Sequence, residues 1–177
     1  SFFNGILVNQ FRGKNVIITG GNRGIGLSIA KKLASNGSNI AILAKTDVPH
    51  PKLPGTIFTA AKEIEQLGVK VLPIKTDIRF DVQVESAIEQ VIENFGSIDI
   101  LVNNAGILRD KSFHKISIEE FDQVMDVHFQ GSFYASHGVY PIMREQNFGR
   151  IIFTTSSGGL CGNFGQANYG AAKMGMI

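Results

Sequence analysis

Five short runs of apolar residues recur along the chain and are separated by stretches with helical periodicity. Each run is rich in Ile, Val or Leu, and most of the runs are apolar on both faces. Strands of a parallel sheet have this composition when helices cover both faces of the sheet. The five predicted strands are residues 15–20, 39–44, 70–76, 98–103 and 150–155.

Helical periodicity is clearest between the third and fourth strands. Apolar residues recur there at i, i+3, i+4, i+7, i+8 and i+11, the spacing of an amphipathic helix: Val84, Ala87, Ile88, Val91, Ile92 and Phe95. A shorter stretch of the same kind, 25–33, follows the first strand. Strands that alternate with helices predict βαβ units, so we expect one α/β domain over residues 1–177, with a Rossmann-type doubly wound parallel sheet. The stretch 45–55 contains three prolines and is predicted to be a surface loop.

Composition excludes several classes of protein. The 17 Lys and Arg residues nearly balance the 15 Asp and Glu residues and form no cluster, so we expect no nucleic-acid partner. The single cysteine, Cys161, rules out an internal disulfide, and no apolar run reaches the length of a membrane span. No metal site is predicted. Segment 1–15 is too short and irregular for a signal peptide, and a chain that begins with Ser1 is expected to be processed or excerpted.

The first strand runs into the glycine-rich turn "TGGNRGIG", residues 19–26. A glycine turn between a strand and a helix lets the backbone approach a pyrophosphate, which then sits over the helix N-terminus. Any tight turn between a strand and a helix also favours glycine, but the position at the start of an alternating chain favours a dinucleotide site. The candidate cofactor contacts are Gly20, Gly21, Asn22, Arg23, Gly24, Ile25 and Gly26.

Tyr169 and Lys173 stand four residues apart near the end of the chain, and Ser156 precedes the tyrosine by thirteen residues. If the segment from Ala167 onward is helical, the tyrosine and the lysine share one face. A nearby lysine cation lowers the pKa of a tyrosine and converts the phenol into a general acid/base. Ser156 could donate a hydrogen bond to a substrate oxygen. The alternative is a chance spacing, with a solvated lysine and a serine that caps a turn.

These motifs together resemble the short-chain dehydrogenase/reductase family, from about Phe11 to the end of the chain. The resemblance rests on "TGGNRGIG", on "NNAG" at 103–106, and on the serine, tyrosine and lysine that follow in order. "KTDVPHPKLPGTIFTAAKEIE" is similar to hydroxysteroid-dehydrogenase-like proteins of peroxisomes and mitochondria. "NNAGILRDKSF" and "GNFGQANYGAAK" are similar to the 3-hydroxyacyl-CoA dehydrogenase domain of peroxisomal multifunctional enzymes. The motifs do not decide between these two groups of proteins.

The resemblance implies catalytic roles for Ser156, Tyr169 and Lys173, of which the last two also contact the cofactor. Family members usually carry a catalytic asparagine on the long central helix, where this chain has His128. The histidine falls on an apolar stripe of that helix and should face inward. Either it is an ordinary core histidine, or its ring holds a water that relays protons to Lys173.

Other residues follow the family by position. Asp77 is expected to contact adenine, or else to cap a turn. Asn103, Ala105 and Gly106 are expected beside the cofactor, or else to form an ordinary turn. Cys161 is expected near the substrate cleft as a small buried hydrophobe.

The residues after the second strand predict NADP rather than NAD as the cofactor. A carboxylate near this point normally binds the adenosine ribose of NAD, but the strand ends at Ala44 and Lys45 follows. The Lys45 ammonium can meet the 2′-phosphate of NADP, with Arg23 as a second cation. Asp47 is the competing candidate, because it could bind the ribose of NAD if the loop folds back. Otherwise Lys45 is simply a solvated loop residue.

The resemblance implies an NAD(P)-dependent oxidoreductase that interconverts a secondary alcohol and a ketone, with a 3-hydroxyacyl-CoA or another lipid as substrate, in the peroxisome or the mitochondrion. The alternative is a structural subunit that keeps the nucleotide-binding fold. Family members usually continue beyond the helix of Tyr169 and Lys173, so we expect an incomplete domain, truncated after this helix. Its uncovered sheet surface should be covered by a missing C-terminal part, by another chain or within a homo-oligomer.

Overall fold

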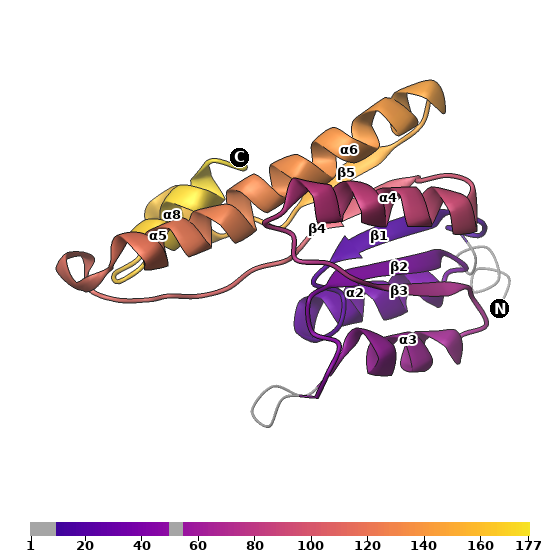
Figure 1. The fold of residues 1–177 in the computed structure, drawn as a ribbon, viewed down its shortest axis with the longest axis horizontal. Helices are drawn as coiled ribbons and strands as arrows, with labels where there is room; N and C mark the ends of the chain where they lie inside the picture. Colours follow the sequence, from indigo (N-terminus) through magenta and orange to yellow (C-terminus); the bar gives the residue numbers. More distant parts are fainter. Residues whose placement is uncertain (1–9, 50–54) are drawn as a thin grey trace, which may run out of the picture.

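The computed structural model describes residues 10–49 and 55–177, which form a parallel sheet of five strands covered by helices (Figure 1). The strand order is β3-β2-β1-β4-β5, and every neighbouring pair runs parallel. The chain starts in the middle of the sheet, moves outward to β3, then crosses to β4 and β5 on the other side. This is the predicted Rossmann-type arrangement, and all five predicted strands are confirmed. The strands are β1 (Asn15–Thr19), β2 (Asn39–Ala44), β3 (Val71–Lys75), β4 (Ile100–Asn103) and β5 (Arg150–Phe153).

The helices predicted after β1, before β4 and from Ala167 onward are confirmed as α2, α4 and α8. The sequence did not predict α3, which begins with a capping box in which Thr56 and Thr59 each accept a backbone hydrogen bond from the other. Part of the predicted loop 45–55 lies outside the described residues. The helices are α2 (Gly24–Ala34), α3 (Ile57–Glu65), α4 (Asp81–Phe95), α5 (Ile118–Met125), α6 (Gly131–Glu145), α7 (Ser157–Cys161) and α8 (Ala167–Met174), with a 3₁₀ turn η1 (Phe113–Lys115) and a π-helical turn η2 (Asp126–Gln130).

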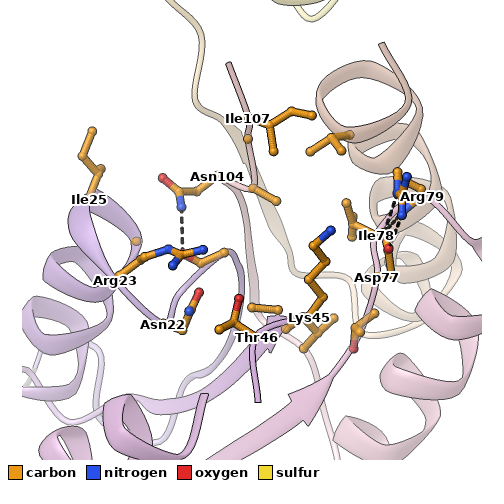
Figure 2. Close-up of a pocket in the computed structure, with 18 of the residues that line it drawn as sticks. Asn22, Arg23, Ile25, Lys45, Thr46, Asp77, Ile78, Arg79, Asn104 and Ile107 are labelled. Carbon is orange, nitrogen blue, oxygen red and sulfur yellow. Dashed lines mark hydrogen bonds and ion pairs between the residues drawn. The ribbon is translucent and has the colours of Figure 1, made fainter. Parts of the chain in front are cut away.

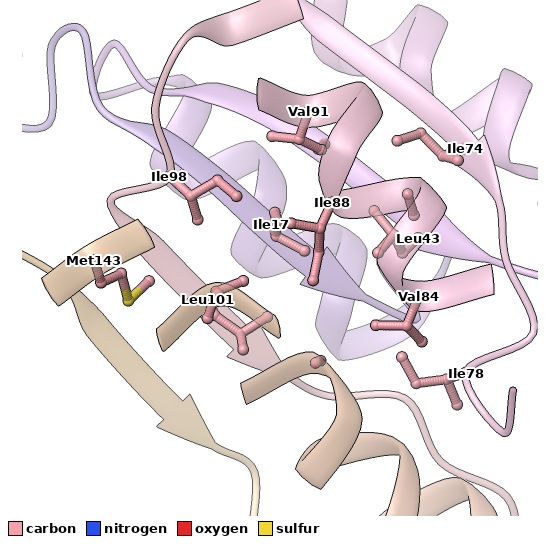
Figure 3. Packing of buried hydrophobic residues seen from close by; sticks show 14 residues of the cluster. Ile17, Leu43, Ile74, Ile78, Val84, Ile88, Val91, Ile98, Leu101 and Met143 are labelled. Atoms are coloured by element: carbon pink, nitrogen blue, oxygen red, sulfur yellow. The ribbon is translucent and has the colours of Figure 1, made fainter. Parts of the chain in front are cut away.

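Successive residues of the central strands bury their side chains on opposite faces of the sheet. On one face, Ile17 and Leu101 pack with residues of α4 and α6, and Figure 3 shows this cluster around Ile88 and Val91. On the other face, the neighbours of Ile17 in β1 pack against α2 and α3. Apolar burial on both faces therefore explains why residues 16–18 of β1 and 100–102 of β4 are all apolar.

Strand β5 forms an edge of the sheet and differs from the other strands in its burial. Ile152 and Phe153 are exposed, although the apolar run predicted a buried strand. Among the described residues, only β4 pairs with β5. The strand thus leaves apolar surface in contact with solvent. The helices within 10–49 and 55–177 are all too short or too polar to cross a bilayer.

Asp99 ties β1 to the turn before β4. Its buried carboxylate accepts hydrogen bonds from the backbone N–H of Asn15 and from the Lys14 ammonium, both at 2.9 Å. The Asn15 amide continues the network by donating to Ser97 Oγ at 2.8 Å and to the Phe95 carbonyl at 3.1 Å. One carboxylate therefore organises the amino edge of the sheet.

Replacing Asp99 by alanine should lower the free energy of unfolding by about 2–3 kcal/mol, because two hydrogen bonds to a charged group are lost and a buried N–H is left unpaired. Urea denaturation followed by circular dichroism measures the change. Asp122→Ala, at an exposed carboxylate on α5, is the matched control and should change stability by less than about 0.5 kcal/mol. Equal effects of the two substitutions would show that the Asp99 network contributes nothing specific.

Candidate active site

A pocket of ≈ 320 Å³ lies at the carboxyl edge of the sheet, where the segments after β1, β2, β3 and β4 converge (Figure 2). Doubly wound sheets bind dinucleotides at this edge. Most of the residues that the sequence assigned to cofactor binding line the pocket. They are Gly20, Asn22, Arg23, Ile25, Gly26, Lys45, Asp77, Ala105 and Gly106, whereas Gly21, Gly24, Asn103, Tyr169 and Lys173 lie outside its lining.

The glycine turn between β1 and α2 is too tight for side chains. Gly20 and Gly24 have φ values of +67° and +54°, a left-handed conformation that favours glycine. A Cβ on Gly26 would lie 2.3 Å from the Gly20 carbonyl oxygen and 2.5 Å from Nδ2 of Asn104. The turn therefore presents bare backbone to the pocket, as a phosphate-binding turn requires.

The start of α2 offers hydrogen-bond donors to the pocket. Arg23 occupies the N-cap position and makes no side-chain capping bond, so the first N–H groups of the helix remain available for a ligand. Atom Nη1 of Arg23 is buried and has no hydrogen-bond partner among the described residues. Because an unpaired buried donor is costly, an anion in the pocket would stabilise this arrangement. These donors fit the pyrophosphate of a dinucleotide cofactor.

The turn after β4 is bonded to the end of β1. Thr19 Oγ1 accepts hydrogen bonds from the backbone N–H groups of Asn104 and Ala105, both at 3.0 Å. The Asn104 amide donates in return to the carbonyls of Thr19 at 3.1 Å and Gly20 at 3.2 Å. These four bonds hold the glycine turn and the "NNAG" turn together as two walls of one pocket.

Asn103 lies outside the pocket, and Asn104, which the sequence analysis missed, lines it (Figure 2). The buried Asn103 amide donates to Ser136 Oγ on α6 at 3.0 Å. Alternation along β4 contains the signal for this placement. Leu101 packs against the layer of α4 and α6, so Asn103, two residues later, shares that face.

Lys45 and an Asp77–Arg79 pair supply the charges at the ends of β2 and β3 (Figure 2). Arg79 donates to the Asp77 carboxylate through Nε at 2.9 Å and through Nη2 at 2.6 Å. The hydrogen bond from Arg79 is the main cause that holds the pKa of Asp77 below its usual value, and the charge of Lys45 acts in the same direction. Arg79 is a second pocket residue that the sequence analysis missed.

Asp47 does not line the pocket. Its carboxylate lies 2.8 Å from the ammonium of Lys75 at the end of β3, and this hydrogen bond lowers the pKa of Asp47. The segment after β2 therefore directs Asp47 toward the neighbouring strand and Lys45 toward the pocket. The Asn22 amide donates to the carbonyl of Gly55, just before α3, at 3.1 Å.

The four predicted catalytic residues gather around helix α8. Lys173 Nζ lies 5.6 Å from the centre of the Tyr169 ring. The His128 ring meets the tyrosine ring edge-on, with centroids 5.2 Å apart and an interplanar angle of 88°. Ser156 flanks the same site, since a Cβ built on Gly158 would lie 3.5 Å from Ser156 Oγ and 3.8 Å from Tyr169 Cε1. The predicted helical pairing of tyrosine and lysine is therefore present in the structure.

Lys173 is held in place by backbone groups of the segment after β5. Its ammonium donates to the Thr154 carbonyl, and its own carbonyl accepts a hydrogen bond from Thr155 Oγ1 at 3.2 Å. The residue is only 4% exposed, and this burial lowers its pKa to about 8. The side chain is therefore a cation at neutral pH, but close to the pH at which it loses its proton.

Ser156 is the N-cap of α7. Its Oγ accepts a hydrogen bond from the Gly158 N–H at 3.2 Å. The capping role expected as the alternative is thus real, but it does not exclude a catalytic one. A hydroxyl that accepts one bond still has its own proton to donate.

His128 lies in the π-helical turn η2 that interrupts the long helix formed by α5 and α6. Such turns widen the helix locally and are frequent at functional sites. The ring packs on the "NNAG" turn so closely that a Cβ on Gly106 would lie 2.4 Å from His128 Cε1. Atom Nε2 lies 2.8 Å from the Ile107 carbonyl oxygen and 3.0 Å from the Ile107 N–H nitrogen.

The two nitrogens of the His128 ring differ in their hydrogen bonding. The residue is 3% exposed, and Nδ1 makes no hydrogen bond within the described part of the chain. Burial lowers the pKa of His128 to about 4. The hydrogen bond to Ile107 acts to raise this pKa, and the charge of Lys173 acts to lower it. The ring is therefore neutral at physiological pH, and the inward orientation predicted from the apolar stripe is confirmed.

Cys161 is exposed, so the prediction of a small buried hydrophobe is wrong. The residue ends the five-residue helix α7, and no other described segment packs over this end. Helix α7 is short and lies at the surface of the protein, so only one of its sides is buried. Gly158 is its only buried residue.

Comparison with known proteins shows the family to which most of the chain is similar. Residues 14–177 match the family model described as short chain dehydrogenase. Human hydroxysteroid dehydrogenase-like protein 2 is 44% identical over 143 residues, which cover 81% of this chain and 34% of that protein. Peroxisomal multifunctional enzyme type 2 of Drosophila melanogaster is 38% identical over 170 residues, which cover 95% of this chain and 28% of that protein. The chain thus spans about a third of the length of these relatives.

The same arrangement of strands and helices occurs in a solved structure. An NAD⁺-bound xylitol dehydrogenase superposes with a TM-score of 0.87 at 29% sequence identity. The superposition covers 94% of this chain and 62% of the other.

Proposed function

We propose that this chain, which belongs to the short-chain dehydrogenase family, interconverts a secondary alcohol and a ketone with a nicotinamide cofactor. The family binds NAD or NADP, and the resemblance seen in the motifs is confirmed by the match over residues 14–177. The proposal rests on one observation. The group of Ser156, Tyr169, Lys173 and His128 adjoins a pocket that fits a dinucleotide, because His128 contacts Gly106 and Ile107 of the pocket wall.

When bound, the cofactor supplies or accepts the hydride, and the chain manages the proton and the charge on oxygen. In reduction, the ketone oxygen gains charge, Ser156 donates a hydrogen bond to it, and Tyr169 transfers its hydroxyl proton to it. The Lys173 cation stabilises the phenolate that remains. Oxidation of the alcohol follows the same steps in reverse.

His128 is proposed to hold a water that links its ring to Lys173. Its Nδ1 is buried and unpaired, and a buried polar atom of this kind is usually satisfied by an internal water. Both groups flank the Tyr169 ring, with the His128 centroid 5.2 Å and Lys173 Nζ 5.6 Å from its centre, and the proposed water would lie between them. The neutral ring then accepts a hydrogen bond from this water through Nδ1, and the water relays protons to Lys173.

His128→Ala should lower kcat by about 100-fold, at the low end of the effect of a proton-transfer group, because the relay is broken but Tyr169 remains. His128→Asn should restore most of the rate, since an amide can also bond to Ile107 and hold a water. The pKa of about 4 predicts that kcat shows no ionisation of this histidine across the neutral pH range. His137→Ala, at an exposed histidine on α6, is the control. A wild-type rate in His128→Ala would show that His128 takes no part in proton transfer and is an ordinary core histidine.

NADP is the proposed cofactor. Lys45 lines the pocket, Arg23 adds a second cation, and the competing Asp47 is engaged by Lys75. A 2′-phosphate would find positive charge where NAD-specific sites have a carboxylate.

The proposed substrate is a 3-hydroxyacyl-CoA or another lipid, and the proposed location is the peroxisome or the mitochondrion. The printed name of the Drosophila relative supports the peroxisome. Exposed apolar side chains close to the catalytic group support a lipid. Leu160 is 64% exposed and Phe164 is 87% exposed, on the segment between Ser156 and Tyr169. We also propose that a homo-oligomer, another chain or further C-terminal residues cover the exposed strand β5.

Turnover of cofactor in the full-length protein tests the proposed function. With acetoacetyl-CoA as the ketone, we expect NADPH to be consumed and its absorbance to fall. A control without ketone excludes spontaneous oxidation. If neither NADPH nor NADH is consumed with acetoacetyl-CoA or with simple ketones, the alternative of a structural subunit becomes the better explanation.

A further inference from the structure

An open groove of ≈ 860 Å³ lies between the carboxyl-terminal halves of α4 and α6. Helices of a doubly wound fold run opposite to the strands, so this groove is at the amino edge of the sheet, away from the cofactor pocket. In Figure 1, α4 and α6 lie on the same face of the sheet, and their carboxyl-terminal ends extend away from α8. The groove is lined by Ile88, Ile92 and Ile142, by Glu89, Glu93 and Glu145, and by Gly96 and Gln146.

Packing of the two helices explains why the groove is present. A Cβ on Gly138 would lie 2.5 Å from Cδ1 of Ile88, so the helices touch where α6 has no side chain. One turn farther along, Ile92 and Ile142 are only partly buried. Because no described side chain fills the space beyond the contact, the groove has an apolar floor that is open to solvent.

The charges around this floor all have the same sign. Its lining contains three glutamates and no Lys or Arg, although the whole chain has a net charge of +2. None of the three glutamates forms an ion pair with any of residues 10–49 or 55–177. The floor is therefore bordered by carboxylates that are available to a partner.

The glutamates on α4 oppose the stability of their own helix. Glu85, Glu89 and Glu93 follow one another at intervals of four residues, where like charges repel. Glu93 also lies near the end of the helix, where the dipole favours cations, and the last turn of α4 has no basic residue. A cationic partner would relieve both effects at once.

We propose that this groove binds a cationic amphipathic helix of a partner protein. The apolar face of such a helix would rest on the three isoleucines, and its Lys or Arg residues would meet Glu89, Glu93 and Glu145. A groove between two helices has the shape that accepts a third helix. The proposal is independent of the proposed dehydrogenase function, because no groove residue belongs to the pocket or to the catalytic group.

The test uses a fluorescein-labelled peptide of roughly 15 Leu and Lys residues, with Leu at i, i+3, i+4 and i+7. Fluorescence anisotropy with the full-length protein should show binding that weakens as salt is added. The triple variant Glu89→Gln, Glu93→Gln, Glu145→Gln should weaken binding about tenfold, because three ion pairs are lost. The matched control changes three exposed carboxylates elsewhere, Glu65→Gln, Glu119→Gln and Asp122→Asn, and should bind like wild type.

Hydrogen exchange should show protection of α4 and α6 by the peptide, and cofactor turnover should be unchanged in the groove variant. Four results would overturn the proposal. They are no binding of the peptide, equal weakening by the control variant, equal binding of a peptide with Glu in place of Lys, and protection confined to other helices. Self-association that the groove variant abolishes in the absence of peptide would also overturn it, because the occupant would then be a second copy of this chain.

Discussion

Replacing Tyr169 by phenylalanine should reduce the rate of ketone reduction by about 10²–10⁴-fold and leave the affinity for the cofactor nearly unchanged. The substitution removes one hydroxyl group and keeps the ring, so the edge-on contact with His128 at 5.2 Å should persist. Lys173 keeps its bond to the Thr154 carbonyl, and the pocket lining does not include Tyr169. The loss should therefore fall on kcat. Stopped-flow measurement of cofactor oxidation in the full-length protein gives the rate, and fluorescence titration gives the affinity.

Tyr140→Phe is the matched control for this loss. Tyr140 lies on α6 and is exposed, and it has no place in the catalytic group. Its substitution should leave both the rate and the affinity unchanged. Wild-type turnover in Tyr169→Phe would remove the proton-transfer role from this residue, and the structural alternative for the tyrosine–lysine pair would then stand.

The sheet was predictable because burial on both faces leaves a strong mark on a strand. Positions 16–18 of β1 are all apolar, which suits only a strand with helices on either side. Two parts of the fold, helix α3 and the exposure of β5, were not predicted, and each has a local cause. Helix α3 follows a proline-rich stretch and depends on the cap formed by Thr56 and Thr59, a signal that periodicity does not contain. Strand β5 has an apolar composition but lies at an edge of the described sheet, and sequence composition does not distinguish a buried strand from an exposed edge strand.

The candidate site was predictable where backbone geometry dictates the residue type. Gly26 must be a glycine because the Gly20 carbonyl would lie 2.3 Å from any Cβ, and the i, i+4 spacing on α8 is sufficient to pair Tyr169 with Lys173. Contacts between distant segments were not predictable in the same way. Arg79 lines the pocket while its guanidinium bonds to Asp77, and the exposure of Cys161 depends on what packs over α7.

Asn103 and Asn104 show the limit of interpreting a motif residue by residue. Both are polar and both stand at the end of β4, so composition treats them alike. Strand alternation places the first against α6 and leaves the second to bond to the glycine turn. The period of two along β4 therefore assigns Asn104, and not Asn103, to the pocket.

The placement of Lys45 and Asp47 supports the proposal that the cofactor is NADP. Both residues follow β2, where a residue that binds the adenosine ribose of the cofactor belongs. Figure 2 shows the Lys45 side chain extending into the pocket between Arg23 and the Asp77–Arg79 pair. Asp47 is held by Lys75 at 2.8 Å, and Arg79 offsets the charge of Asp77. The pocket therefore has more positive than negative charge at this point, which favours the additional phosphate of NADP.

Lys45→Ala should weaken NADPH binding by about 10- to 100-fold and barely change NADH binding, because a hydrogen bond to a charged group contributes about 1.5–3 kcal/mol. Titration of both cofactors against wild type and variant measures the difference. Lys62→Ala removes an exposed lysine of α3 that lies outside the pocket lining, and it should change neither affinity. Asp47→Ala separates the two candidates, since it should leave NADH binding intact if Lys75 keeps Asp47 away from the ribose. If wild type prefers NADH, or if Lys45→Ala weakens both cofactors equally, Lys45 does not select the phosphate and Asp47 becomes the better candidate.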